Sequence, residues 1–192
     1  MLDLIIKNGK CYIDGELKDV DIAIKDKKIH KIGQISEESK EVIDANAHTV
    51  LPGCIDTQTH FREPGSTDTE DLHSGSRAAI AGGITSVFEM PNTNPPTSNK
   101  KEFQRKLDLA KNRMYCNYAF YFGATADNAN DLASLKDLEG CCGIKLFAGS
   151  STGNLLVAEE DDIDKVFKNS SKVVAVHSED EAILKVNKKL IK

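Results

Sequence analysis

The chain has 192 residues, of which 40% are hydrophobic, and a formal net charge of −5. This composition is typical of a soluble globular protein with one full domain, or with a small domain and part of a larger one. The negative charge argues against nucleic acid or an anionic membrane as the main partner, and no apolar run approaches the roughly 18 residues of a membrane span. The N-terminus lacks a secretory signal. The five cysteines are odd in number and scattered, so we expect buried free thiols in the reducing cytoplasm.

Residues 1–50 show the short alternating runs of a small β-region. Asp14-Gly15 is a hairpin signal between two such runs, and Asn8-Gly9 predicts a further turn. These strands could bury little on their own. We therefore expect a small β-sandwich-like region over residues 1–50 that precedes the main domain.

From residue 51 onward the pattern changes to short apolar runs about 30 residues apart, at 51–56, 84–90, 116–122, 143–147 and 173–177. Helical patterns lie between them; residues 67–70 predict a capping box for the first helix, and Asn99 predicts the N-cap of the second. Apolar strands that are each followed by a helix indicate a parallel sheet covered by helices.

We therefore predict an α/β fold in which residues 51–192 form an incomplete (β/α)8 barrel of about five βα units. A doubly wound open sheet is the alternative. A complete barrel takes about 250 residues, so we expect either a fragment of a longer protein or a partner that covers the open side.

Residues 51–65 carry the densest group of candidate site residues. They form an apolar run between two Pro-Gly breaks, which is typical of one buried strand ending in a tight turn. Alternation along the strand would place Asp56, Gln58, His60 and Arg62 on one face. Polar groups there are costly unless they bind something, so the set suggests a metal beside an anionic substrate. A satisfied polar cluster that closes a barrel is the alternative.

Further candidates lie at later strand ends, where a parallel barrel places its active site. Lys145 falls in a predicted buried strand; burial would lower its pKa and favour a neutral amine, which can react with carbon dioxide to form a carbamate that bridges two metals. The alternative is a lysine that snorkels or pairs with an acid such as Glu89. His177 ends the fifth strand and is either a zinc ligand or a structural histidine. Residues 149–153 predict a flexible loop near the mouth of the site and lack the GK[ST] ending of a phosphate loop.

Four segments, in order along the chain, resemble motifs of the dihydroorotases of the amidohydrolase superfamily. Residues 55–65 (IDTQTHFREPG) resemble the first metal motif, and residues 90–97 (MPNTNPPT) resemble the second. Residues 144–147 (IKLF) resemble the segment of the carboxylated lysine, and residues 176–180 (VHSED) resemble the segment of the strand-five metal histidine. The resemblance covers nearly the whole chain, including the small β-region.

This resemblance implies the reversible cyclisation of N-carbamoyl-L-aspartate to dihydroorotate in pyrimidine synthesis, with one or two Zn²⁺ ions. It implies that His60 binds the first metal, that Lys145 bridges both as a carbamate, and that His177 binds the second. Arg62 and Asn92 would hold the substrate carboxylate, because arginine can donate two parallel hydrogen bonds to it. The metals would polarise the amide carbonyl and lower the pKa of water toward about 7. We expect a small-molecule substrate and a cytoplasmic homo-oligomer.

Two departures from the family pattern keep alternatives open. Gln58 stands where the usual DxHxH motif has its first histidine, and an amide oxygen is a poorer zinc ligand than an imidazole. The family's later metal histidine and its catalytic aspartate have no counterpart in these 192 residues. One alternative is another cyclic amidase, such as a hydantoinase or allantoinase, against which Arg62 with Asn92 argues. The other is a non-catalytic dihydroorotase-like scaffold that binds a partner enzyme. Gln58 and the missing half of the site favour it, and Lys145, His177 and Arg62 argue against it.

Overall fold

The computed structural model describes residues 1–149 and 154–190. The chain divides into two compact units, Met1–Gly53 and Cys54–Lys192. Apart from Gly149, the loop predicted at 149–153 lies outside the described residues. Within the described ranges, none of the helices has both the length and the apolar character needed to cross a bilayer.

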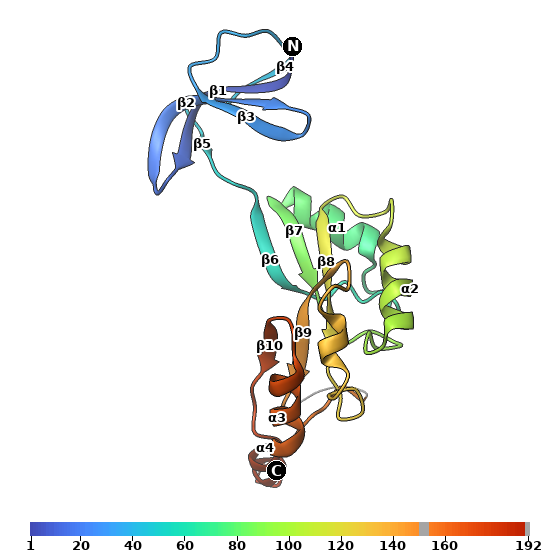
Figure 1. The fold of residues 1–192 in the computed structure, drawn as a ribbon. Coiled ribbons are helices and arrows are strands. Elements are labelled where there is room, and N and C mark those ends of the chain that lie inside the picture. The colour runs from blue at the N-terminus through green and yellow to red at the C-terminus, as the bar shows by residue number, and fades with distance from the viewer. Residues whose placement is uncertain (150–153, 191–192) are drawn as a thin grey trace. The chain divides into compact units, whose positions relative to one another are not determined.

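The first unit is a five-stranded sheet with β1 in contact with three neighbours (Figure 1). Its strands are β1 (Leu2–Ile13), β2 (Glu16–Lys25), β3 (Lys28–Gly33), β4 (Ser39–Asp44) and β5 (Thr49–Val50). β1, β2 and β3 are antiparallel neighbours, whereas β4 and β5 run parallel to β1. The Asp14-Gly15 hairpin turn between β1 and β2 is confirmed. The turn predicted at Asn8-Gly9 is wrong, because these residues form an irregularity inside β1, with Asn8 at a left-handed φ of 55°.

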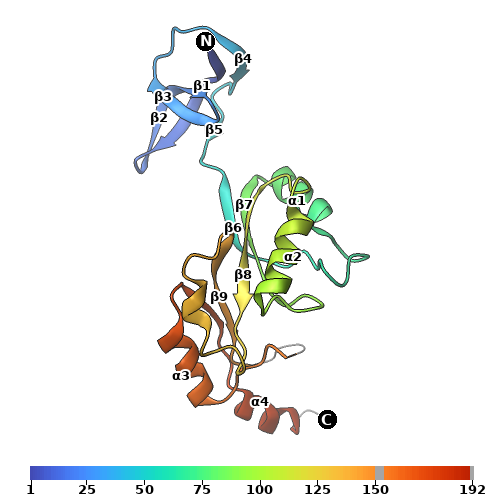
Figure 2. The same ribbon diagram turned by 45° about the vertical axis from the view of Figure 1, so that its right-hand side comes forward.

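The second unit is a parallel sheet in the order β10-β9-β8-β7-β6. Its strands are β6 (Cys54–Thr59), β7 (Ile84–Glu89), β8 (Asn117–Gly123), β9 (Cys141–Phe147) and β10 (Val174–His177). The connections contain α1 (Leu72–Ala81), α2 (Lys100–Ala110), the 3-10 helix η1 (Leu132–Leu135) and α3 (Glu160–Asn169), and α4 (Glu181–Lys188) follows β10. Figure 2 shows α1 and α2 beside β7 and β8, along a sheet that curls like part of a barrel. The predicted α/β fold with a partial parallel barrel is confirmed.

The core of this unit lies between the sheet and its helices. Phe103 of α2 packs in one buried cluster with Phe120 and Phe122 of β8 and with Ile144 and Leu146 of β9. Since side chains alternate along a strand, Lys145 projects from the opposite face of β9. The helices therefore cover one face of the sheet, and the other face carries the polar candidate residues.

β6 differs from the prediction in two respects. Cys54 through Gln58 are exposed rather than buried, because β7 is the one described strand that pairs with β6. The strand also ends at Thr59, and Arg62 has a left-handed φ of 58°. The predicted alternation therefore does not extend through His60 and Arg62.

The first helix begins later than the capping box predicted at residues 67–70. Asp71 is the N-cap: its carboxylate accepts a hydrogen bond from the backbone N–H of Ser74, and the Ser74 hydroxyl accepts one from the backbone N–H of Asp71. The predicted N-cap at Asn99 is confirmed, since its side chain accepts a hydrogen bond from the backbone N–H of Glu102. Both caps satisfy backbone donors that a helix start leaves free.

The cysteines are free thiols, as predicted. The predicted burial is confirmed for Cys11, Cys116 and Cys141 and is wrong for Cys54, which is exposed in β6. Burial raises the pKa of all three buried thiols. Burial also raises the pKa of the partly buried Cys142, to about 12.

The turn after β6 is fastened by the buried carboxylate of Glu63. Its two oxygens accept hydrogen bonds from Nη1 and Nη2 of Arg113 at 2.7 and 3.1 Å. The same carboxylate accepts a hydrogen bond from the backbone N–H of Leu72 at 2.9 Å. The turn is thereby tied both to the start of α1 and to the segment after α2.

We expect Arg113→Met to lower the free energy of unfolding by about 2–3 kcal/mol, because the Glu63 carboxylate would stay buried without its cation. Urea denaturation measures the change. The matched control is Arg105→Met, which removes an exposed pair with Glu102 at 3.3 Å and should change stability by less than about 0.5 kcal/mol. Equal effects of the two substitutions would contradict the anchoring role of Glu63.

The turn is also positioned by contact between Phe61 and α1. The Phe61 ring lies so close to Gly75 that a Cβ at this position would be 2.4 Å from Phe61 Cδ1. Such a distance requires either the ring or the helix to move. Glycine at this position therefore lets the segment that follows His60 lie against α1.

We expect Gly75→Ala to destabilise the protein by about 1–2 kcal/mol, because overpacking outweighs the higher helix propensity of alanine. The control is Gly82→Ala at the end of α1, where an added Cβ meets nothing closer than Ala79 O at 3.5 Å. This control should be neutral or slightly stabilising. Thermal unfolding of both variants gives the comparison, and two shifts of the same sign would refute the proposed close contact.

Candidate functional site

Parallel pairing brings the C-terminal ends of β6 to β10 to one edge of the sheet. His60 and Arg62 directly follow β6, and Asn92 lies three residues beyond the end of β7. Lys145 lies in the last half of β9, and His177 is the final residue of β10. The five residues come from four strands but share one end of the sheet, as expected for a barrel-type site.

His60 is half-buried and lies within a group of polar side chains. Burial lowers its pKa, and the positive charge of Arg62 lowers it further. The Asn92 side chain is close enough to the imidazole to raise the pKa, whereas the charges of Lys145 and Lys106 lower it. The net direction is downward, which favours the neutral imidazole that binds a metal ion.

Arg62 and Asn92 line one pocket with a volume of about 330 Å³. The rest of its lining comes from the turns after β6 and β7: Pro64, Ser66, Thr93, Asn94 and Pro96. A guanidinium and an amide that open into the same small pocket can both donate hydrogen bonds to an anion. The pocket can therefore hold a small ligand by a carboxylate group.

Lys145 is 4% exposed. Within the described ranges its ammonium group has no hydrogen-bond or ion-pair partner, and its Nζ lies 5.0 Å from the centroid of the Phe147 ring. Burial lowers the pKa of Lys145, which favours the nucleophilic, neutral amine. The alternative pairing with Glu89 is wrong, because Glu89 forms its ion pair with Lys106.

His177 lies on the same face of the sheet as Lys145. Ala175 pairs in register with Lys145, and His177 pairs with Phe147, so the alternation of both strands matches. The His177 and Phe147 ring centroids are 6.1 Å apart. Nε2 of His177 is 2.5 Å from a carboxylate oxygen of Glu179, a contact that fixes the orientation of the ring.

Gln58 is placed differently from the other predicted ligands. It is exposed within β6, and its backbone N–H donates to the Asp56 carboxylate at 2.9 Å. No hydrogen bond between described residues joins its side chain to another predicted ligand. In the described part of the chain, no group of three or more His, Cys, Asp or Glu side chains could hold a metal. The predicted set therefore depends on Lys145 to supply oxygen ligands as a carbamate, which its buried and unpaired amine fits.

Sequence reasoning missed the role of Lys106. This residue of α2 is completely buried, pairs with Glu89 at the end of β7, and donates a hydrogen bond to Met90 O at 2.8 Å. Its Nζ also lies 5.1 Å from the centroid of the Phe120 ring. A signal was present, because Lys106 shares the inward helix face with Phe103 and Ala110 at spacings of three and four residues.

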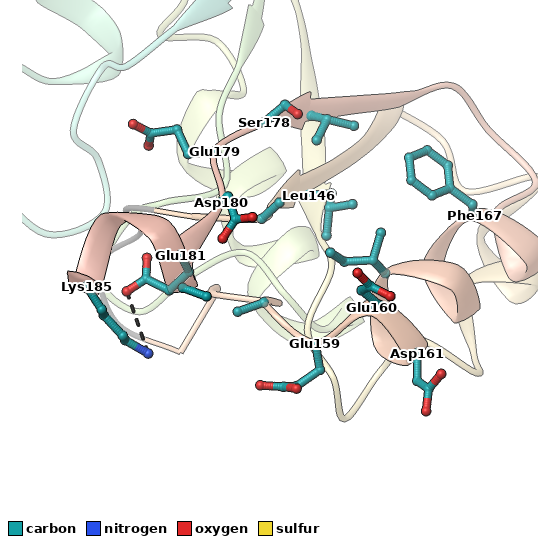
Figure 3. Close-up of a pocket in the computed structure, with 15 residues that line it drawn as sticks. Leu146, Glu159, Glu160, Asp161, Phe167, Ser178, Glu179, Asp180, Glu181 and Lys185 are labelled. Carbon is teal, nitrogen blue, oxygen red and sulfur yellow. Dashed lines mark ion pairs between the residues drawn. The ribbon is translucent and has the colours of Figure 1, made fainter. Parts of the chain in front are cut away.

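A larger cavity, of about 1090 Å³, lies between the end of β10 and the starts of α3 and α4 (Figure 3). Carboxylates dominate its polar lining: Glu159, Glu160, Asp161, Glu179, Asp180 and Glu181. Lys185 also lines it, 3.8 Å from Glu181. None of the predicted site residues lines this cavity, although Glu179, which contacts His177, does.

The comparisons with known proteins agree with this fold. The amidohydrolase family model matches residues 49–189. A dihydroorotase of Methanosarcina mazei is 38% identical over 185 residues, which cover 94% of this chain and 40% of the relative. An allantoinase of Escherichia coli is 36% identical over 190 residues, which cover 94% of this chain and 42% of the relative.

Among solved structures, the L-hydantoinase of Arthrobacter aurescens superposes with a TM-score of 0.91 at 28% identity, covering 100% of this chain and 44% of that one. The chain thus spans about two fifths of the length of these relatives. The relatives differ in their named activities, and each matches nearly all of this chain. On this evidence the chain belongs to the amidohydrolase family.

Proposed function

We propose that the protein containing this chain is a dihydroorotase, which interconverts N-carbamoyl-L-aspartate and dihydroorotate. The observation that carries the proposal is the pocket shared by Arg62 and Asn92, beside the half-buried His60. Dihydroorotate is a cyclic amide with a carboxylate on its ring. A site for it therefore needs an anion clamp next to the groups that act on the amide bond.

In this proposal Arg62 and Asn92 bind and orient the substrate. The guanidinium donates two hydrogen bonds to the ring carboxylate, and the Asn92 amide donates another. Fixing the carboxylate at one end of the ring directs the amide bond toward His60 and Lys145. Such positioning lowers the entropic part of the barrier.

His60, Lys145 and His177 are the residues that would hold Zn²⁺. His60 and His177 would offer ring nitrogens, and Lys145 would offer the oxygens of a carbamate. When bound, the metal supplies Lewis-acid polarisation of the amide carbonyl. None of the residues of this chain is proposed as the general acid or base, and Gln58 is not proposed as a metal ligand.

A second candidate is a cyclic amidase that acts on allantoin or hydantoin. The 36% identity to an allantoinase and the superposition on a hydantoinase favour it. Hydantoin carries no carboxylate, so Arg62 would then have no charged partner on the substrate. The two candidates differ in what Arg62 does.

We expect Arg62→Met to raise KM for dihydroorotate about 10- to 100-fold, since a hydrogen-bonded charge pair contributes roughly 1.5–3 kcal/mol. Metal content should not change. Steady-state kinetics on dihydroorotate and hydantoin measure the effect, with Arg77→Met on the exposed side of α1 as the control. An unchanged KM for dihydroorotate would refute the clamp, and wild-type turnover of hydantoin well above that of dihydroorotate would favour the second candidate.

We expect Lys145→Ala to lose most of its bound metal, because the proposed carbamate on Lys145 would supply the bridging oxygens. Elemental analysis of the purified protein measures metal per chain. After incubation with ¹³C-labelled bicarbonate, a carbamate carbon signal should appear in the wild-type protein and be missing from the variant. The control is Lys136→Ala, an exposed lysine. Full metal occupancy in Lys145→Ala would rule out the bridging carbamate.

A further inference from the structure

The Glu89–Lys106 ion pair connects two segments that carry candidate site residues. Glu89 is the last residue of β7, three positions before Asn92. Lys106 reaches from α2, forms the ion pair, and donates a hydrogen bond to Met90 O at 2.8 Å. One ammonium group therefore contacts two consecutive residues at the start of the turn that leads to Asn92.

The Glu89 carboxylate also lies beside the turn after β6. Thr59 pairs in register with Glu89, and the backbone N–H of Met90 donates to Thr59 O at 3.0 Å. The backbone amide of Phe61 lies close enough to the Glu89 carboxylate to favour its charged form. Phe61 lies between His60 and Arg62 in the sequence, so the Glu89 carboxylate is next to the residue that joins these two.

Stability alone is a poor explanation for this pair. Glu89 is 1% exposed and Lys106 is completely buried. Burial raises the pKa of Glu89 to about 7 against the opposing charge of Lys106, which shows how strongly desolvation disfavours the carboxylate. Apolar side chains of similar size in the place of a buried ion pair often leave a protein equally or more stable. An apolar pair could neither donate the hydrogen bond that Lys106 makes to Met90 O nor place a carboxylate beside the backbone amide of Phe61.

We propose that Glu89 and Lys106 are positioning residues that fix the turn after β6 relative to the turn after β7. They thereby hold His60 and Arg62 next to Asn92. The effect of this arrangement on catalysis rests on the proposed function. The positioning itself is a property of the backbone and can be measured without turnover.

The test replaces the pair by apolar side chains in the double variant Glu89→Met/Lys106→Met, made in the protein as its gene encodes it. We expect a urea midpoint equal to or above that of the wild type. The amides of residues 60–62 and 91–93 should exchange hydrogen at least about tenfold faster, while those of α3 stay unchanged. An exchange rate at wild-type level in both turns of the stable double variant would overturn the proposal.

A second variant keeps the test decisive if the double variant does not fold. Glu89→Gln preserves the shape of the side chain and removes its charge, so we expect faster exchange at Phe61 and Arg62. Wild-type exchange at both amides would again overturn the proposal. The matched control is Glu102→Gln/Arg105→Met, which removes an exposed ion pair of the same helix and should leave both turns unchanged.

Kinetics separate this proposal from the proposed function. If the wild type turns over dihydroorotate, the double variant should lose at least about tenfold in kcat/KM at an unchanged urea midpoint, and a wild-type kcat/KM would overturn the positioning role. If the wild type turns over no cyclic amide, the proposed function fails. Hydrogen exchange in the two turns then still decides whether the pair positions them.

Discussion

Parallel pairing of five strands is the constraint on which the rest of the second unit depends. Because β6 to β10 run in one direction, their C-terminal ends open at the same edge of the sheet. Residues far apart in sequence, such as His60 and His177, therefore lie at the same end of the sheet. Alternation within β9 then separates two environments, with Ile144 and Leu146 in the core beneath the helices and Lys145 on the opposite face.

The two buried lysines show how differently one residue type can be used. Lys106 has a carboxylate, a carbonyl and an aromatic ring around it. Burial lowers its pKa, and the charge of Glu89 and the hydrogen bond to it oppose that shift. Lys145 has none of these polar partners among the described residues, and burial alone lowers its pKa. The surroundings of each lysine therefore suit it to a different role. Lys106 hydrogen-bonds to the backbone at Met90 O, whereas Lys145 is suited to react as a neutral amine.

Sequence patterns predicted most of the sheet well, because strands buried beneath helices have apolar sequences that can be recognised locally. They were wrong for β6, whose exposure depends on which strands pair with it. They also failed at Arg62, where a left-handed backbone breaks the alternation. His60, Lys145 and His177 were selected as candidates by their places in or after predicted strands, and a resemblance of motifs supplied their expected roles. Lys106 was missed because a lysine on a helix is normally exposed, and no local pattern shows that Met90 O and Glu89 lie within its reach.

The distribution of thiols has a consequence for the redox chemistry of the protein. Cys11, Cys116 and Cys141 are shielded and held in the protonated form by burial, so oxidants and alkylating reagents reach them slowly. Cys54 is exposed at the first residue of β6. Oxidative damage would therefore begin on the strand that leads to His60, six residues before the imidazole, and would reach the hydrophobic core last.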